Sequence, residues 1–121
     1  HAGNGEGAIR KLVTCAMEAG PHVTKELATS KLAETVDLVV QVHLETVPLG
    51  DDKWRRSRWV SEIVHVAPGE AAKGYAVTHV FRPNLAGGPA VPGTLPDELR
   101  ELEQHGFDIN AYLADNGREA V

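Results

Sequence analysis

The chain has 121 residues, of which 42% are hydrophobic and 24% charged, proportions that are ordinary for one globular domain or part of one. Seventeen acidic against twelve basic residues give a net charge of -5, which argues against a general nucleic-acid binder because phosphate contacts need a basic face. The single cysteine excludes an internal disulfide and a cysteine-rich zinc site. No apolar run approaches the length of a membrane span.

The N-terminal part of the sequence predicts two helices. Apolar residues recur at helical spacing over residues 6–19, with Asn4 as the N-cap and Gly20-Pro21 as the stop. A second helix is expected over residues 24–36, capped by Thr24. Because a patterned helix follows His1 almost at once, we expect the chain to be a piece of a longer protein.

The middle of the sequence predicts three strands. Residues 37–44 are β-branched and almost all apolar, which is typical of a strand covered on both faces. Residues 56–66 alternate, with Val60 and Glu62 on one face and Trp59 and His65 on the other, and residues 75–82 alternate as well. Turn signals at 49–52 and 68–69 make the links short, so an antiparallel meander is expected.

The C-terminal part predicts a link and two short helices. Residues 83–96 contain four prolines, and helical patterns follow over residues 96–105 and 108–115, separated by Gly106. The predicted order is two helices, three strands, a loop and two helices. We expect residues 1–83 to form one unit and residues 84–121 to form a linker and helical tail.

Two glycine-rich segments suggest phosphate binding, but simpler interpretations suit both. Residues 88–94 have the glycine spacing of a phosphate loop, yet they lack its lysine and contain two prolines, so we interpret them as a linker. Residues 3–7 open a helix, whose N-terminus can hold an anion. A dinucleotide fingerprint needs a preceding strand, which favours a flexible helix start here.

Three histidines, His43, His65 and His79, fall on successive predicted strands, where a three-histidine metal site is possible in principle. Strand register cannot be derived from the sequence and no carboxylate spacing supports such a site, so satisfied or solvated histidines are favoured. Cys15 and Met17 lie on or beside the apolar stripe of the first helix, which favours core packing over redox chemistry.

One segment combines basic and aromatic residues: Lys53-Trp54-Arg55-Arg56-Ser57-Arg58-Trp59, called here the basic-aromatic cluster. It has three interpretations. Stacking and charge suit single-stranded nucleic acid; exposed charges and amphipathic tryptophans suit the tip of a hairpin; and arginine and tryptophan are enriched in subunit interfaces. The hairpin tip is the favoured interpretation.

Four short motifs, in this order, resemble a known family. They are His1-Ala2-Gly3-Asn4 followed by Ala8-Ile9-Arg10-Lys11-Leu12; the passage from Ala33 through Asp37-Leu38-Val39-Val40-Gln41-Val42; Arg55-Arg56 before Val60-Ser61-Glu62-Ile63-Val64; and Gly93-Thr94 with Pro96, Leu99 and Gly106-Phe107-Asp108. Over about residues 1–113 they resemble the His box and following segments of type II/IV secretion traffic ATPases, especially the CpaF/TadA-like branch of Tad pilus assembly.

The resemblance implies an α/β fold, namely the C-terminal part of a RecA-like P-loop NTPase domain. It further implies a homo-hexamer that hydrolyses ATP on the cytoplasmic face of the inner membrane, powers pilus assembly or protein secretion, and meets inner-membrane platform proteins rather than nucleic acid. ATP and Mg²⁺ would be held by residues of the parent protein outside this chain. The chain alone, without a Walker A loop, is expected not to hydrolyse ATP.

The only catalytic residue carried over by the resemblance is His1, whose counterpart lies near the γ-phosphate and couples the nucleotide state to subunit motion. Gly3 departs from the pattern, because the family has Asn or Asp there and Asn4 stands one place later. Two alternatives remain: a stand-alone α+β protein-interaction module without catalysis, and a nucleic-acid-binding module. Both would use the basic-aromatic cluster as their binding surface.

Overall fold

The computed structural model of the chain describes residues 1–69 and 73–119; residues 70–72, in the predicted loop before the third strand, and residues 120–121, at the end of the predicted tail, lie outside the described residues. The elements follow the predicted order, except that a short fourth strand lies in the predicted loop and the first helix of the tail is a 3-10 helix. They are α1 (Gly5–Met17), α2 (Lys25–Thr35), β1 (Leu38–Gly50), β2 (Lys53–Pro68), β3 (Tyr75–Arg82), β4 (Val91–Pro92), the 3-10 helix η1 (Asp97–His105) and α3 (Ile109–Glu119).

The predicted starts of α1 and α2 are confirmed by their caps, whereas α1 ends at Met17, before the predicted stop at Gly20-Pro21. The Asn4 side chain accepts a hydrogen bond from the Gly7 backbone N–H, and the Thr24 hydroxyl accepts one from Leu27, so each satisfies a donor that the first helical turn leaves unpaired. Gly106 ends η1 at φ 98°, a left-handed conformation that glycine adopts without strain.

The four strands form one sheet in the order β1-β2-β3-β4, with every neighbouring pair antiparallel. The predicted meander is therefore confirmed, and the fold is mixed α and β. RecA-like sheets are parallel, so the strands described here are not such a sheet.

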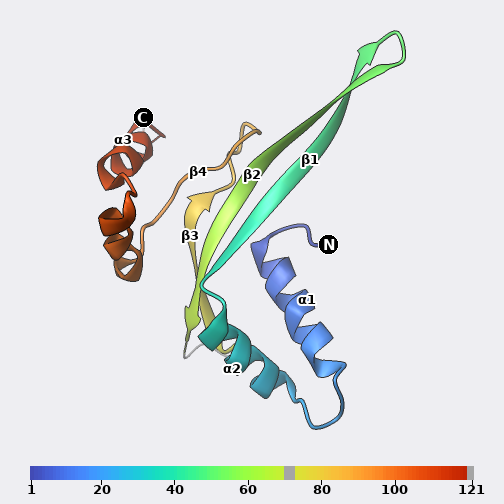
Figure 1. Cartoon of the computed structure of the whole chain (residues 1–121), viewed down its shortest axis with the longest axis vertical. Coiled ribbons are helices and arrows are strands. Elements are labelled where there is room, and N and C mark those ends of the chain that lie inside the picture. The colour runs from blue at the N-terminus through green and yellow to red at the C-terminus, as the bar shows by residue number, and fades with distance from the viewer. Residues whose placement is uncertain (70–72, 120–121) are drawn as a thin grey trace.

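The helices α1 and α2 lie on one side of the sheet, and the tail of η1 and α3 lies on the other side, beside β4 (Figure 1). Because apolar residues recur at helical spacing on α1 and α2, these helices pack against the part of the sheet that contains Val64, Val66 and Tyr75. The resulting core consists of Ile9, Val13, Ala28, Leu32, Ala33, Val64, Val66 and Tyr75. We call these two helices and the part of the sheet that they cover the helical lobe.

Beyond the helical lobe, β1 and β2 continue as a two-stranded hairpin arm, residues 42–60 (Figure 1). β3 pairs with β2 only from Ile63 to Pro68, so most of the arm has no third strand beside it. Both strands are longer than predicted, because pairing with each other continues through exposed and charged positions that carry no burial pattern.

The prediction that the first strand is covered on both faces is wrong for the described residues. β1 is an edge strand, and its apolar residues Leu38, Val40, Val42 and Leu44 are all exposed, Val42 by 55%. An apolar run shows what a strand is built to bury, but only the tertiary structure shows whether a neighbour is present.

A bulge corrects the predicted faces of the second strand. Val60 pairs with Val42 and Glu62 pairs with Gln41, which leaves Ser61 as an extra residue. Because cross-strand partners share a face, Val60 and Glu62 lie on opposite faces, not on the same one. This agrees with their burial, since Glu62 is buried and Val60 is exposed.

The expected packing of Cys15 and Met17 is also wrong. Cys15 is exposed and Met17 is 40% exposed, because α1 buries only Gly5, Ile9 and Val13 against its neighbours. Leu12 and Ala16 of the predicted stripe are exposed as well, and Ala8 is half-buried.

Candidate functional site

Hydrogen bonds to two side chains of the sheet hold the chain around residues 1–4, the segment that precedes α1. The backbone carbonyl of Ala2 accepts a hydrogen bond from the Gln41 Nε2 at 2.9 Å. Asn4 then caps α1 through its own side chain. The His1 side chain is exposed at the end of this segment. His1 is therefore presented at the surface by a short piece of chain whose next residues are held.

A second attachment comes from Glu62, a buried carboxylate on β2. Its Oε1 accepts a hydrogen bond from the Gly5 backbone N–H, the first residue of α1. Its Oε2 lies 3.4 Å from the Nε2 of His79 on β3. A carboxylate suits this place because the unpaired N–H groups at a helix N-terminus favour negative charge.

Gly5 allows this close approach because it has no side chain. A Cβ built at Gly5 would lie 2.6 Å from the Glu62 Oε1. Gln41 and Glu62 are themselves direct partners across β1 and β2. Two adjacent side chains of the sheet therefore hold the chain on both sides of Gly3 and Asn4, and they set where His1 can lie. Sequence reasoning selected His1 but not these two residues, because the contacts span 39 and 57 positions of the chain.

The three histidines do not form a cluster. His43 pairs with Trp59, His65 pairs with Leu38 and Thr78, and His79 pairs with Val64, so they occupy different levels of the sheet. Instead, the His43 ring packs on Trp59 with 4.6 Å between centroids, His65 is buried, and His79 faces Glu62. Among residues 1–69 and 73–119, no three His, Cys, Asp or Glu side chains are grouped so as to hold a metal ion.

The glycine-rich segment 88–94 lies along β3 and includes β4. The backbone N–H groups of Ala90, Gly93 and Thr94 donate to the carbonyls of Val60, Val80 and His79, each at 2.9 Å. These donors complete the sheet and do not point into a phosphate cradle. The linker interpretation is wrong for Val91–Pro92, which form the buried strand β4.

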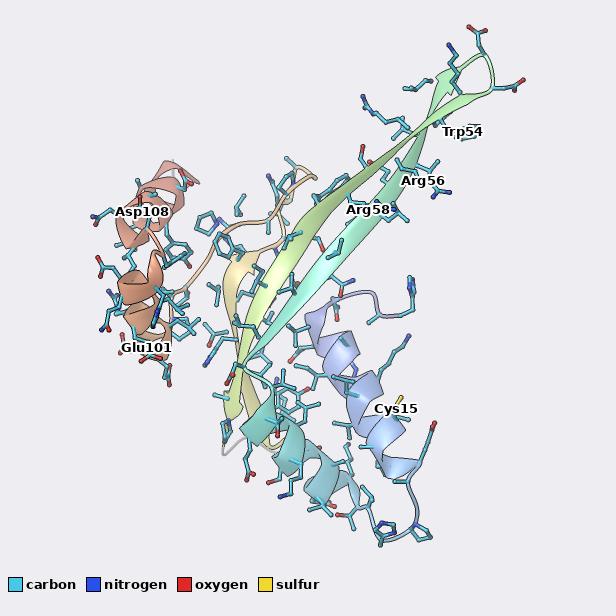
Figure 2. The ribbon with its side chains drawn as sticks, viewed as in Figure 1. Cys15, Trp54, Arg56, Arg58, Glu101 and Asp108 are labelled. Atoms are coloured by element: carbon cyan, nitrogen blue, oxygen red, sulfur yellow. The ribbon has the colours of Figure 1, made fainter. Side chains whose placement is uncertain are left out.

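The basic-aromatic cluster lies on the arm, as the hairpin-tip interpretation predicts (Figure 2). Strand alternation divides it between two faces. Trp54, Arg56 and Arg58 share one face and are exposed, Trp54 by 65%. Trp59 lies on the other face, in contact with His43.

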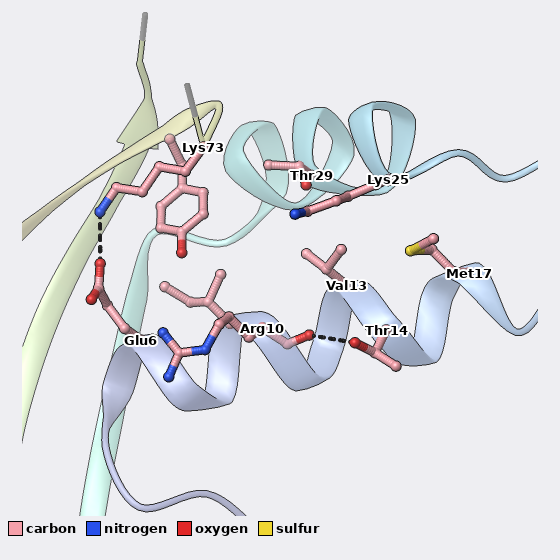
Figure 3. A pocket seen from close by; sticks show the side chains of 10 residues that line it. Glu6, Arg10, Val13, Thr14, Met17, Lys25, Thr29 and Lys73 are labelled. Carbon is pink, nitrogen blue, oxygen red and sulfur yellow. Dashed lines mark hydrogen bonds and ion pairs between the residues drawn. The ribbon is translucent and has the colours of Figure 1, made fainter. Parts of the chain in front are cut away.

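A cavity of about 480 Å³ lies between α1, α2 and the start of β3 (Figure 3). Its apolar lining includes Ile9, Val13, Met17 and Tyr75, and cationic side chains reach it from Arg10, Lys25 and Lys73. The sequence contains no sign of this cavity, because the three cations come from separate elements.

At the edge of this cavity, Lys73 Nζ lies 2.7 Å from Glu6 Oε1 and 5.0 Å from the centre of the Tyr75 ring (Figure 3). The hydrogen bond from Lys73 lowers the pKa of Glu6, and the same bond raises the pKa of Lys73. The pair stays charged across the neutral range and joins α1 to the residues before β3.

In the described part of the chain, no helix is both long enough and apolar enough to cross a membrane. Comparisons with known proteins give no match to a family model, to a curated protein or to a solved structure.

Proposed function

We propose that this chain is the C-terminal portion, from the His box onward, of the RecA-like motor domain of a secretion traffic ATPase of the CpaF/TadA-like branch. The parent protein would be a hexamer at the cytoplasmic face of the inner membrane that powers Tad pilus assembly or type II/IV secretion through contacts with platform proteins. ATP and Mg²⁺ would bind to parent residues outside this chain, so the chain alone would turn over no ATP.

The observation that carries the proposal is the attachment of the His1 segment to the sheet. The motif resemblance joins His1–Asn4, Gln41 and Glu62 only through their order in the sequence. In the fold the same residues are in contact, through the Gln41–Ala2 and Glu62–Gly5 hydrogen bonds. A residue that senses a nucleotide needs such support, because a phosphate contact is specific only when the donor is held in place.

The free edge of β1 is a second support. The backbone groups along this edge are what an added strand would pair with, and its exposed residues Val40, Val42 and Leu44 leave one face open to a further packed element. Under the proposal, β1 adjoins the parallel sheet of the parent domain, and β1 to β4 form an antiparallel extension. Mixed sheets of this kind are common in α/β proteins.

The chemistry proposed for His1 follows from its imidazole. An imidazole donates a hydrogen bond in both its neutral and its charged form, so it can bind a phosphate oxygen. Gln41 and Glu62 act as positioning residues, because they hold the backbone on either side of Asn4. The nucleotide supplies the hydrolysable phosphate, and these side chains report on its presence.

The test has two steps. The coding sequence that precedes His1 should contain Gly-x-x-x-x-Gly-Lys-Ser/Thr, as every P-loop motor requires. In the full gene product, His1→Ala should then lower kcat by about tenfold or more while changing the KM for ATP much less, as expected for loss of a contact made in the transition state. His22→Ala, an exposed histidine in the loop between α1 and α2, is the control. A missing P-loop motif, or full activity of His1→Ala, contradicts the proposal.

The alternative is a stand-alone α+β interaction module without catalysis, and the exposed arm favours it. Trp54 is 65% exposed, and an aromatic side chain in such a position is a common anchor in protein interfaces. In that case Trp54→Ala would abolish partner capture while His1→Ala would have no effect on any activity. The two variants together distinguish the proposals.

A further inference from the structure

Two exposed surfaces of opposite charge lie on opposite parts of the molecule. The first is on the arm, where Trp54, Arg56 and Arg58 share a face with their β1 partners Pro48, Thr46 and Leu44 (Figure 2). Two guanidinium groups, an indole and an exposed leucine make this arm face both cationic and apolar. Guanidinium groups suit carboxylates, which they can bind with two hydrogen bonds.

The second surface is on the tail. From Asp97 to Asp115 the chain has six carboxylates against a single arginine, Arg100, which binds Asp97 at 3.3 Å. Side chains three apart in a 3-10 helix lie above one another, so Glu98 and Glu101 form one exposed acidic row on η1. Leu113 on α3 is 47% exposed and supplies an apolar residue to the same tail.

The two surfaces belong to elements at opposite edges of the sheet. The arm is built from β1 and β2, while the tail lies beside β4 (Figures 1 and 2). The arm also points away from the body of the fold, and Glu101 lies on the far side of the sheet from Arg56 and Arg58. The arm and the tail of one copy are therefore free to bind different copies of the chain.

We propose that the arm face of one copy of this chain docks on the acidic tail of a second copy. Arg56 and Arg58 would pair with the Glu98–Glu101 row, and Trp54 would cover apolar tail surface near Leu113. Each copy offers one arm and one tail, so the contact is head-to-tail and can repeat from copy to copy, as a closed ring requires. That the contact closes a ring rests on the proposed function. The contact between the arm and the tail does not, because it is argued from the charges and exposure of these two surfaces.

The charges around the arm favour this occupant over a phosphate-bearing one. Asp51 and Asp52 occupy the turn, and Glu45 lies on β1 within the arm. Glu45 pairs with Ser57 and so lies on the opposite face from Arg56 and Arg58, while the two turn carboxylates oppose the continuous phosphate surface of a membrane or a nucleic acid. A folded partner can instead avoid them and meet the arginines alone. The chain as a whole is acidic, which makes a second copy a suitable partner for the arm.

The test is a charge swap measured by sedimentation equilibrium on the 121-residue chain. Arg56→Glu with Arg58→Glu, and separately Glu98→Lys with Glu101→Lys, should each weaken self-association by about tenfold or more, because like charges then face each other. Mixing the two variants should restore association, since each then offers a surface that complements the other. Added salt should weaken association of the unmodified chain. Lys11→Glu with Lys31→Glu, on α1 and α2, makes the same charge change as the arginine variant; it is the control for that variant and should have little effect.

The proposal is overturned by an unmodified chain that stays monomeric, by charge-reversed variants that associate as before, or by a mixture that does not recover association. If copies instead paired through the β1 edge, the charge-reversed variants would associate as before. Arm-dependent binding to anionic vesicles or to a single-stranded oligonucleotide without self-association would also overturn it. No nucleotide is used, so the outcome is independent of whether the parent gene contains the P-loop motif or whether His1→Ala affects ATP turnover.

Discussion

The helical lobe and the hairpin arm share the strand β2, yet they differ in what holds them. In the lobe, Ile9 and Val64 are completely buried because α1 and α2 cover the sheet. In the arm, Val42 and Leu44 on β1 are about half exposed, although both lie in the apolar run that predicts a covered strand. The comparison teaches that α1 and α2 decide burial in the lobe, whereas the arm is held by the pairing of β1 with β2 and by side-chain contacts such as that of His43 with Trp59.

The largest effect should come from the lobe core. Ile9→Ala removes a fully buried side chain and leaves a cavity, so the free energy of unfolding should fall by about 2–5 kcal/mol. Leu44→Ala on the arm, the matched control, should cost less than about 1 kcal/mol because its side chain is already half in water. Urea denaturation monitored by circular dichroism measures both. Equal losses would contradict the division into lobe and arm.

The next effect concerns the boundary between the two regions. Glu62→Ala leaves the buried Gly5 N–H without its acceptor and His79 without its partner, which should cost about 1–3 kcal/mol. Amide hydrogen exchange should also show a less protected start of α1. The control Glu45→Ala removes an exposed carboxylate from the arm and should leave both measurements within error.

A smaller effect should come from the tail, whose Tyr112 hydroxyl donates to the Val80 carbonyl at 2.7 Å. Tyr112→Phe keeps the ring contacts with Phe81 and Phe107 and loses only this bond, at a cost of about 0.5–1.5 kcal/mol. Burial raises the pKa of Tyr112 above its ordinary value of 10.0, so the folded state holds the proton more tightly than the unfolded state. The resulting stabilisation is complete below that ordinary pKa and is lost as the pH rises through the raised one.

Unfolding curves at increasing alkaline pH should therefore show stability falling more steeply for the parent chain than for Tyr112→Phe. Similar curves for the two would mean that the hydroxyl is not buried in solution.

The smallest effect should come from the Glu6–Lys73 pair. Both side chains are partly exposed, by 39% and 47%, so Lys73→Met should cost no more than about 1 kcal/mol. The hydrogen bond from Lys73 lowers the pKa of Glu6, so its contribution is present above the ordinary value of 4.5 and is lost as the pH falls through the lowered pKa. An NMR titration should show the pKa of Glu6 rising towards 4.5 in Lys73→Met. Arg56→Met on the arm should leave it unchanged.

Much of the fold could be predicted from local signals. Asn4 and Thr24 are caps, Gly106 ends a helix, and short turns impose antiparallel neighbours. The candidate site could be predicted only in part. His1 came from a motif, whereas the hydrogen bonds of Gln41 and Glu62 depend on register, which a single bulge at Ser61 changes. Nothing in the local pattern reveals such a bulge.

The sequence by itself determined which segments are helices and strands and the order in which they occur, because caps, turns and periodicity act over a few residues. Only the tertiary structure decided that β1 lies at an edge, that Cys15 faces outward, and that the charges of the arm and the tail stand on different sides of the sheet. These features depend on which elements pack against each other. The free energy of that packing comes from apolar surface contributed by residues far apart in the chain.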